Sequence, residues 1–296
     1  MREGRPKAFY GLALVFGLFV LFLYGPMVAI VVLSFQGPQG GLTFPLNGFS
    51  LHWFGRLWSG GGIVDIKSAF GRSLGLGLVA MVLTVVLSTL AGLAYRKRFL
   101  GANLLFTVTV ASLIVPSIVT SLGIALQFRI LDDAIKAHAP AFVADAHTTL
   151  MGLYSSALGA HLTWTLPFGL LIMFAVFNRF DGRLEEAARD LGATPWQSFR
   201  YVVLPLILPS LVGIGLFGFT LSWDEIARSS QTVGERNTLP LELQALTTTV
   251  TTPEIYALGT VTTAVSFLVI GLALAVILTL RAPQARLGSD AGKELA

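Results

Sequence analysis

The chain has 296 residues, of which 54% are hydrophobic and 12% are charged, with a formal net charge of +4 and no cysteine. Ordinary soluble domains carry about 25% charged residues, so this composition excludes a single water-soluble core. The lack of cysteine excludes disulfides and thiolate metal sites. The sequence pI near 9.6 would suit nucleic acid, but the basic residues are spread over positions that flank apolar segments, so we expect no nucleic-acid partner.

Six apolar segments are each long enough to cross a bilayer, whose hydrocarbon layer of about 30 Å needs about 20 helical residues. A backbone exposed to lipid must bond within its own segment, so each is predicted to be a helix. The first is too long for the core of a signal peptide, and Pro116 is expected to kink the third. In chain order the predicted helices are 9–35, 73–95, 103–128, 150–177 (with Pro167), 202–223 and 256–280.

The predicted fold class is therefore all-α, a polytopic membrane protein with six transmembrane helices. We expect one transmembrane domain over 9–280, between an N-terminal segment 1–8 and a C-terminal tail 281–296. Basic residues of membrane proteins gather on the cytoplasmic side. Because most of the 20 Lys and Arg residues lie on one side of the six helices, both termini and the loop 178–201 are predicted to be cytoplasmic: Arg2, Arg5, Lys7, Arg96, Lys97, Arg98, Arg179, Arg183, Arg189, Arg200, Arg281, Arg286 and Lys293.

The loop 178–201, between the fourth and fifth helices, carries the most informative pattern of the chain. Asp181 suits a helix N-cap, and one apolar face follows at helical spacing through Leu184, Ala187, Ala188 and Leu191. Gly192 then suits a left-handed C-cap, which would end this first short helix.

A second short helix is predicted to begin directly after the glycine. Thr194 supplies an N-cap hydroxyl, Pro195 stands at the first helical position and Gln197 at the third, which is the pattern of a capping box. Two short helices meeting at a glycine elbow can dock into a groove on a partner protein. The alternative is a helix lying in the lipid headgroups, but such helices are usually rich in Lys and Arg, whereas this one carries four acids.

The order of residues in this loop resembles the coupling loop of the permease subunits of ATP-binding-cassette importers. The resemblance rests on Glu-Ala-Ala at 186–188, Gly192 after three further residues, and Leu204-Pro205 at the end. From about Ser68 to Leu280 the chain resembles the core of type I importer permeases. The resemblance implies that the ATPase-coupling residues are Glu185, Glu186, Ala187, Ala188, Asp190, Gly192, Ala193 and Thr194, and that Leu204 and Pro205 fix where the loop re-enters the membrane.

The resemblance also implies partners, namely ATPase subunits, a second permease subunit and an external solute-binding protein, in a bacterial inner membrane. The sequence has no Gly-x-x-x-x-Gly-Lys-Ser/Thr phosphate loop. We therefore expect no enzyme activity and no cofactor in this chain, with ATP and Mg²⁺ bound by the partner ATPase. The four histidines lack the spacing of metal ligands, so no metal is expected.

The segments 219–225, 229–230 and 238–241 resemble permeases of polyamine uptake, and a different chain is then the expected second permease. Asp224 and Glu225 follow the fifth helix and would attract a cationic solute, although they suit equally well solvated acids or a pair with Arg228. Trp164 and Trp223 are candidates for the solute path. Aromatic residues near a membrane surface also serve as anchors.

Two other classes of protein are weighed against the importer. A transporter driven by an ion gradient commonly carries buried charges near the middle of the membrane, which the six segments lack. A membrane enzyme would need a nucleophile, base or metal constellation, and none assembles from these residues. The function predicted from the sequence is one half of the solute pathway of an ATP-driven importer, with a polyamine-like organic cation as solute and another small solute as the alternative.

Overall fold

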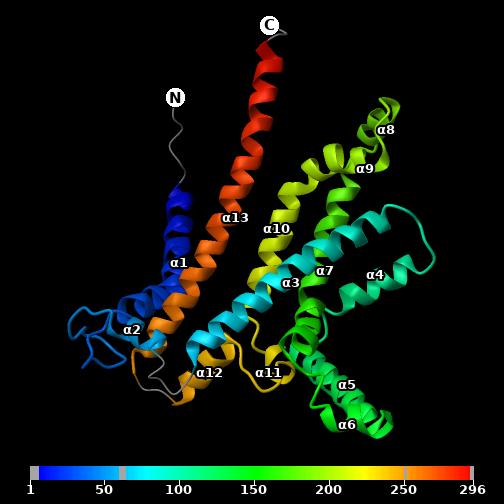
Figure 1. Cartoon of the computed structure of the whole chain (residues 1–296). Helices are drawn as coiled ribbons and strands as arrows, with labels where there is room; N and C mark the ends of the chain where they lie inside the picture. The colour runs from blue at the N-terminus through cyan, green and yellow to red at the C-terminus, as the bar shows by residue number, and fades with distance from the viewer. Residues whose placement is uncertain (1–6, 60–64, 250–251, 294–296) are drawn as a thin grey trace. The chain divides into compact units, whose positions relative to one another are not determined.

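The computed structural model describes residues 7–59, 65–249 and 252–293, and these residues form helices and no β-strand. Figure 1 gives the order of the elements along the chain. Two of the segments are single π-helical turns, labelled η. The elements are α1 Lys7–Leu33, α2 His52–Trp58, α3 Ile66–Tyr95, α4 Ala102–Ala111, α5 Ser117–His138, α6 Ala141–Ala146, η1 Leu153–Ala157, α7 Leu158–Asn178, α8 Arg183–Asp190, α9 Pro195–Ser198, η2 Phe199–Val203, α10 Leu204–Trp223, α11 Ser229–Thr232, α12 Leu239–Thr249 and α13 Glu254–Lys293.

Five helical segments are long and apolar enough to cross a membrane, and a sixth apolar helix, Ala102–Ala111, is shorter. The all-α class is thereby confirmed, and five of the six expected spans are present as long helices, but the third span differs from its prediction. It is not one kinked helix over 103–128, because the chain leaves the helix after Ala111 and restarts at Ser117. Pro116 lacks an N–H and disfavours helical geometry at the residue before it, so the backbone breaks here instead of bending.

Contacts divide the chain into two units, each of which is described by itself. The first unit holds residues 1–67 and 242–265 and includes α1, α2 and the start of α13. In this unit the Gln36 side chain is fully buried and organises the loop that follows α1, because its Oε1 accepts a hydrogen bond from Asn47 N at 2.6 Å. Arg56 pairs with Glu254 at 3.5 Å, and Tyr256 donates to the carbonyl of Leu42 at 2.8 Å.

The second unit, residues 68–241 and 266–296, is built around α7 and α10. Figure 1 shows these two helices side by side, with α8 and α9 joining them at one end. Their shared core contains buried side chains from both helices and from η2, and in a membrane the van der Waals packing of these side chains holds the helices together. The core residues are Met173, Val203, Ile207, Leu211 and Ile214.

Helix α3 packs closely against α7, and each helix places a glycine against side chains of the other. A Cβ added to Gly169 of α7 would lie 2.8 Å from the Ser88 side chain of α3, and one added to Gly92 of α3 would lie 2.8 Å from Met173 Cβ. Thr84 donates a buried hydrogen bond to Thr165 across the same interface at 2.7 Å. Small residues permit this close approach of helices. Inside a membrane, where the hydrophobic effect does not drive helices together, the resulting van der Waals packing stabilises their association.

Candidate functional site

The loop between α7 and α10, residues 178–201, has the predicted form, and we call it the hinge segment. Asp181 lies one residue outside the N-cap, which is Gly182, and its Oδ1 accepts a hydrogen bond from Arg183 N at 3.0 Å. Gly192 has φ +86°, as expected for a left-handed C-cap. The amide of Gly192 donates to Arg189 O at 2.8 Å and that of Ala193 to Ala188 O at 3.0 Å, which is the hydrogen-bond pair of a Schellman motif.

The restart of the helix also matches its prediction. Thr194 N donates to Gln197 Oε1 at 2.8 Å, and Gln197 N donates to Thr194 Oγ1 at 3.3 Å, which completes the capping box with Pro195 at the first helical position. From Pro195 the chain is helical without interruption to Trp223, through η2 and α10. Leu204 and Pro205, expected at the point of re-entry, therefore lie inside a continuous helix, directly after its π-helical turn.

The hinge segment exposes an apolar surface. Leu191 is 91% exposed, Trp196 is 64% exposed, and Leu184 and Tyr201 are also exposed. Ala187 on the same face is exposed, and so are the acids Glu186 and Asp190 beside it. Large apolar side chains grouped on a polar surface mark a site of contact with another protein or with lipid.

Glu185 differs from Glu186, because its carboxylate is held inside the protein. It pairs with Arg96, the residue that follows α3, at 2.7 Å, and with Arg189 at 3.4 Å. The Arg96 guanidinium also lies over the rings of Phe177 and Phe180, at 5.1 and 5.3 Å from the ring centroids. The sequence analysis used Arg96 only to assign the membrane side and missed this contact, which attaches the hinge segment to α3.

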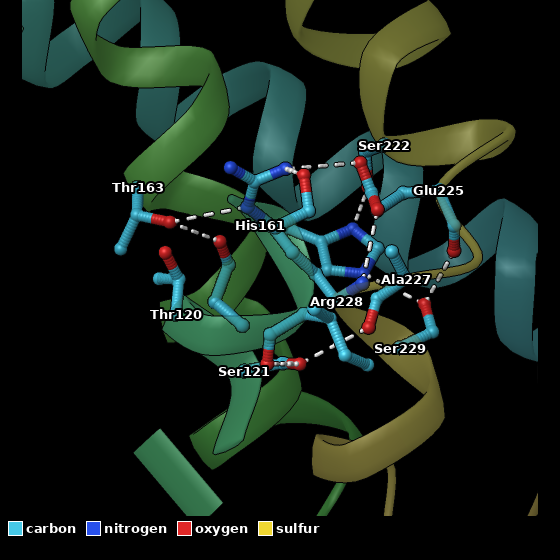
Figure 2. A network of polar contacts seen from close by, with 12 residues as sticks. Thr120, Ser121, His161, Thr163, Ser222, Glu225, Ala227, Arg228 and Ser229 are labelled. Carbon is cyan, nitrogen blue, oxygen red and sulfur yellow. Dashed lines mark hydrogen bonds and ion pairs between the residues drawn. The ribbon is translucent and has the colours of Figure 1, made fainter. Parts of the chain in front are cut away.

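At the other end of α7, a buried polar network surrounds Arg228, as Figure 2 shows. Arg228 is 0% exposed, and its Nη1 lies 3.3 Å from Glu225 Oε2 and donates to Ser117 Oγ at 2.8 Å. Its Nε donates to Thr163 Oγ1 at 3.3 Å, and its guanidinium carbon lies 4.6 Å from the centre of the Trp164 ring. The pairing of Glu225 with Arg228, one of the alternatives in the sequence analysis, is thereby confirmed.

His161 joins α7 to the end of α10 inside the same network. Its Nδ1 lies 2.7 Å from Ser222 Oγ and its Nε2 lies 3.0 Å from Ser229 Oγ. Since the Ser229 hydroxyl donates its single hydrogen to Glu225 O at 2.6 Å, the proton between His161 and Ser229 belongs to Nε2. A histidine in an apolar span gave the sequence analysis no signal of these partners.

The remaining predicted path residues are divided between the interior and the surface. Trp223 is 1% exposed and packs between Phe219 and Phe70, with ring centroids 5.6 Å apart in both pairs. Trp164 is half-buried beside Arg228, as described above. Asp224 ends α10 and is exposed. Partial burial of its carboxyl, together with the charge of Glu225, raises the pKa of Asp224 above its ordinary value.

A polar cleft of about 700 Å³ lies in the same unit, lined by residues that include Arg72, Tyr154, Glu235 and Arg236. Its rim is organised by Asp132, whose carboxylate accepts hydrogen bonds from Thr149 Oγ1 at 2.6 Å and from Leu150 N at 2.7 Å and contacts His147 at 2.9 Å. The bond from Thr149 is the main reason that the pKa of Asp132 lies below its ordinary value. Within the described part of the chain, no group of three or more His, Asp or Glu side chains is arranged to hold a metal ion.

Residues 84–286, which include the hinge segment and the buried polar network, match the family described as binding-protein-dependent transport system inner membrane component. The chain belongs to this family. It is a permease subunit of an importer of the ATP-binding-cassette class, and it is an inner-membrane component of that transporter.

Relatives of this permease extend over most of its length. It is 31% identical over 258 residues to the spermidine/putrescine transport system permease protein PotC of Haemophilus influenzae, covering 86% of this chain and 90% of the relative. It is 32% identical over 242 residues to the putrescine transport system permease protein PotI of Escherichia coli, covering 81% and 80%. A solved bacterial ABC transporter that imports the acidic polysaccharide alginate shares the fold, with a TM-score of 0.61 at 14% identity over 94% of this permease and 95% of that chain.

Proposed function

We propose that this permease receives the free energy of ATP hydrolysis from separate ATPase subunits, which dock on the hinge segment at the cytoplasmic face. The observation that carries this proposal is the exposed apolar surface of Leu184, Leu191 and Trp196 on a rigid elbow, beside the exposed carboxylate of Glu186. An apolar helix face fits a groove on a partner, and the charges around it set its orientation. Both chain termini share the cytoplasmic side in this proposal.

The elbow is built to pass a displacement on to two membrane helices. Gly192 and Thr194 fix the angle between α8 and α9 through backbone and capping hydrogen bonds. Helix α9 continues into α10 without a break, and Glu185 holds α8 to the end of α3 through Arg96. A displacement of the hinge segment therefore reaches α10 directly and reaches α3 through one ion pair. Coupling between ATP hydrolysis and transport requires an element of this kind, whose conformation depends on both the ATPase and the solute site.

The complete transporter in this proposal contains two ATPase subunits that bind ATP and Mg²⁺, a second permease subunit of different sequence and an external solute-binding protein. The family description supports the binding protein, and the lack of a phosphate-loop motif supports an ATP site on another chain. The side chains of α1 are largely exposed and apolar, which suits contact with lipid or with a neighbouring helix.

The proposed solute is a polyamine-like organic cation. Both relatives described above are named for the transport of putrescine or of spermidine and putrescine, and Asp224 is an exposed residue at the end of α10. A carboxylate at the mouth of a pathway raises the local concentration of cations. The proposal predicts ATP-dependent uptake of radiolabelled putrescine by vesicles that contain the reconstituted transporter.

The role of the hinge segment is tested by Glu186→Lys. We expect the variant to insert into the membrane normally, to co-purify less ATPase and to lose uptake by at least about tenfold, because each 1.4 kcal/mol of lost docking energy is a factor of ten in affinity. The measurements are ATPase recovery by quantitative mass spectrometry and solute uptake. Normal uptake by Glu186→Lys would show that the docking surface is elsewhere.

The matched control is Asp133→Lys, which reverses an exposed acid on α5, away from the hinge segment. We expect this control to retain both the ATPase and the uptake of the unmodified permease. A loss of the same size in both variants would indicate a general effect of added positive charge on expression or assembly.

A further inference from the structure

The surroundings of Arg228 are those that an organic cation would need. A carboxylate, from Glu225, and two hydroxyls, from Ser117 and Thr163, contact one side of the guanidinium, and the Trp164 ring faces it at 4.6 Å. Charge-assisted hydrogen bonds combined with an aromatic face are how proteins bind guanidinium and ammonium groups away from water. These groups come from α5, α7 and the segment after α10, so three parts of the fold converge on one cation (Figure 2).

Arg228 does not pair all of its hydrogen-bond donors in this site. Its Nη2 is buried and has no hydrogen-bond acceptor among the residues that the structure describes. An unpaired buried donor destabilises the position that Arg228 occupies. Less free energy is therefore needed to move its guanidinium out of the site. Arg228 also precedes α11 in the short connection from α10, so it is carried by a turn and not by one of the long helices.

We propose that Glu225, Trp164, Ser117 and Thr163 form a binding site for an organic cation, that Arg228 occupies this site as a tethered resident cation, and that the transported solute displaces it. The identity of the displacing solute rests on the proposed function, whereas the cation site itself does not. The exposed Asp224, four residues before Arg228, offers a second carboxylate to the arriving cation or to the released guanidinium.

A resident cation has a measurable consequence for binding. A tethered group competes at an effective concentration in the millimolar range, so a free cation of similar chemistry binds weakly while Arg228 is present. Removing the guanidinium should therefore expose the site and strengthen the binding of small cations. An ion pair that serves stability alone can also admit a small cation once Arg228→Ala empties its place, but it predicts no gain for Arg228→Lys, whose side chain still fills the site.

The experiment measures equilibrium binding to the purified transporter without its solute-binding protein. The probes are methylguanidinium, its uncharged analogue methylurea, and putrescine. We expect Arg228→Ala to bind methylguanidinium and putrescine at least tenfold more tightly than the unmodified transporter, and to show no gain for methylurea. Adding Glu225→Gln to Arg228→Ala should remove the gain, because the carboxylate supplies the charge that the cation needs.

Arg228→Lys extends the series with a variant that keeps the charge. Lysine lacks the planar fork and stacks less well on tryptophan, so it holds the site less firmly than arginine. The expected order of methylguanidinium affinity is unmodified transporter, then Arg228→Lys, then Arg228→Ala as the tightest. If Arg228→Ala fails to assemble, the comparison of Arg228→Lys with the unmodified transporter decides, and equal affinities overturn the proposal.

The outcomes separate this inference from the proposed solute. No gain for methylguanidinium in the variants overturns the cation site, even if the unmodified transporter takes up putrescine. A gain for methylguanidinium without one for putrescine supports the cation site and contradicts the polyamine assignment. Equal gains for methylguanidinium and methylurea would show a cavity without charge selectivity and would also overturn the proposal.

Discussion

The permease carries two arginine–glutamate pairs at opposite ends of α7, and they differ in burial more than in chemistry. Arg96 pairs with Glu185 over the rings of Phe177 and Phe180, and its side chain is 28% exposed. Arg228 pairs with Glu225 over the ring of Trp164, and its side chain is 0% exposed. The first pair joins residues 89 positions apart, and the second joins residues three positions apart.

This difference indicates what each pair does. A partly exposed pair is stabilised weakly because water and salt screen it, so its main effect is to link two elements in a fixed geometry. A buried pair contributes little net stability as a whole, but removing one partner leaves an uncompensated charge. The Arg96 pair is therefore suited to transmit movement of the hinge segment, and the Arg228 pair to hold a charge in a site that water does not reach.

The largest expected effect follows from removing the acid of the buried pair. Glu225→Ala leaves Arg228 buried without its carboxylate, which costs about 3–5 kcal/mol. We expect a fall in the thermal unfolding midpoint and in the yield of assembled transporter, both measured in detergent. Asp224→Asn is the matched control, because it changes the neighbouring acid, which is exposed, and it should leave both quantities nearly unchanged. Equal effects of the two variants would contradict the distinction between a buried and an exposed acid.

At the Arg96–Glu185 pair we expect a smaller effect on stability and a larger effect on coupling. Arg96→Ala should cost about 1 kcal/mol or less in stability, because Arg96 is partly exposed to solvent and Glu185 keeps its pair with Arg189. It should nevertheless lower uptake at least about tenfold with the ATPase still bound, because α8 is then no longer attached to α3. ATPase activity that continues without uptake is the measurement that identifies this uncoupling. Arg98→Ala, which removes an exposed arginine two residues on, is the control.

The smallest effect on uptake is expected at Gly192, in the elbow of the hinge segment, and Gly182, at the start of α8, is its matched control. Neither Gly192 nor Gly182 has any atom within 4 Å of an added Cβ, but Gly192 has φ +86° and Gly182 has φ −62°. Gly192→Ala should cost about 1–2 kcal/mol, because alanine is strained in left-handed geometry. Gly182→Ala should be neutral or slightly stabilising. A similar fall in uptake for both variants would show that the backbone angle at 192 is not what matters.

The sequence predicts the hinge segment well because its determinants are local. Asp181, Gly192, Thr194 and Gln197 act on backbone groups within four residues, and such contacts leave a recognisable spacing. The break at Pro116 was expected only as a kink, because sequence spacing does not tell how far a proline will open a helix when a second helix can start directly after it.

The buried polar network could not be predicted in the same way. The sequence analysis considered Arg228 only as a partner of Asp224 or Glu225, and it assigned no partner to His161. Their contacts join α5, α7 and the segment after α10, across as many as 111 positions of the chain. Only the pairing of Glu225 with Arg228 could be considered from the sequence, because these two residues are three positions apart.

The tight fit between α3 and α7 bears on the mechanics of transport. Gly169 and Gly92 leave no room for even one methyl group, so a side chain at either position would push α3 and α7 apart. This close packing favours movement of α3 and α7 as one unit. A displacement that begins at the hinge segment would then be carried along α7 to the level of Arg228, about 20 Å away at the rise of an α-helix.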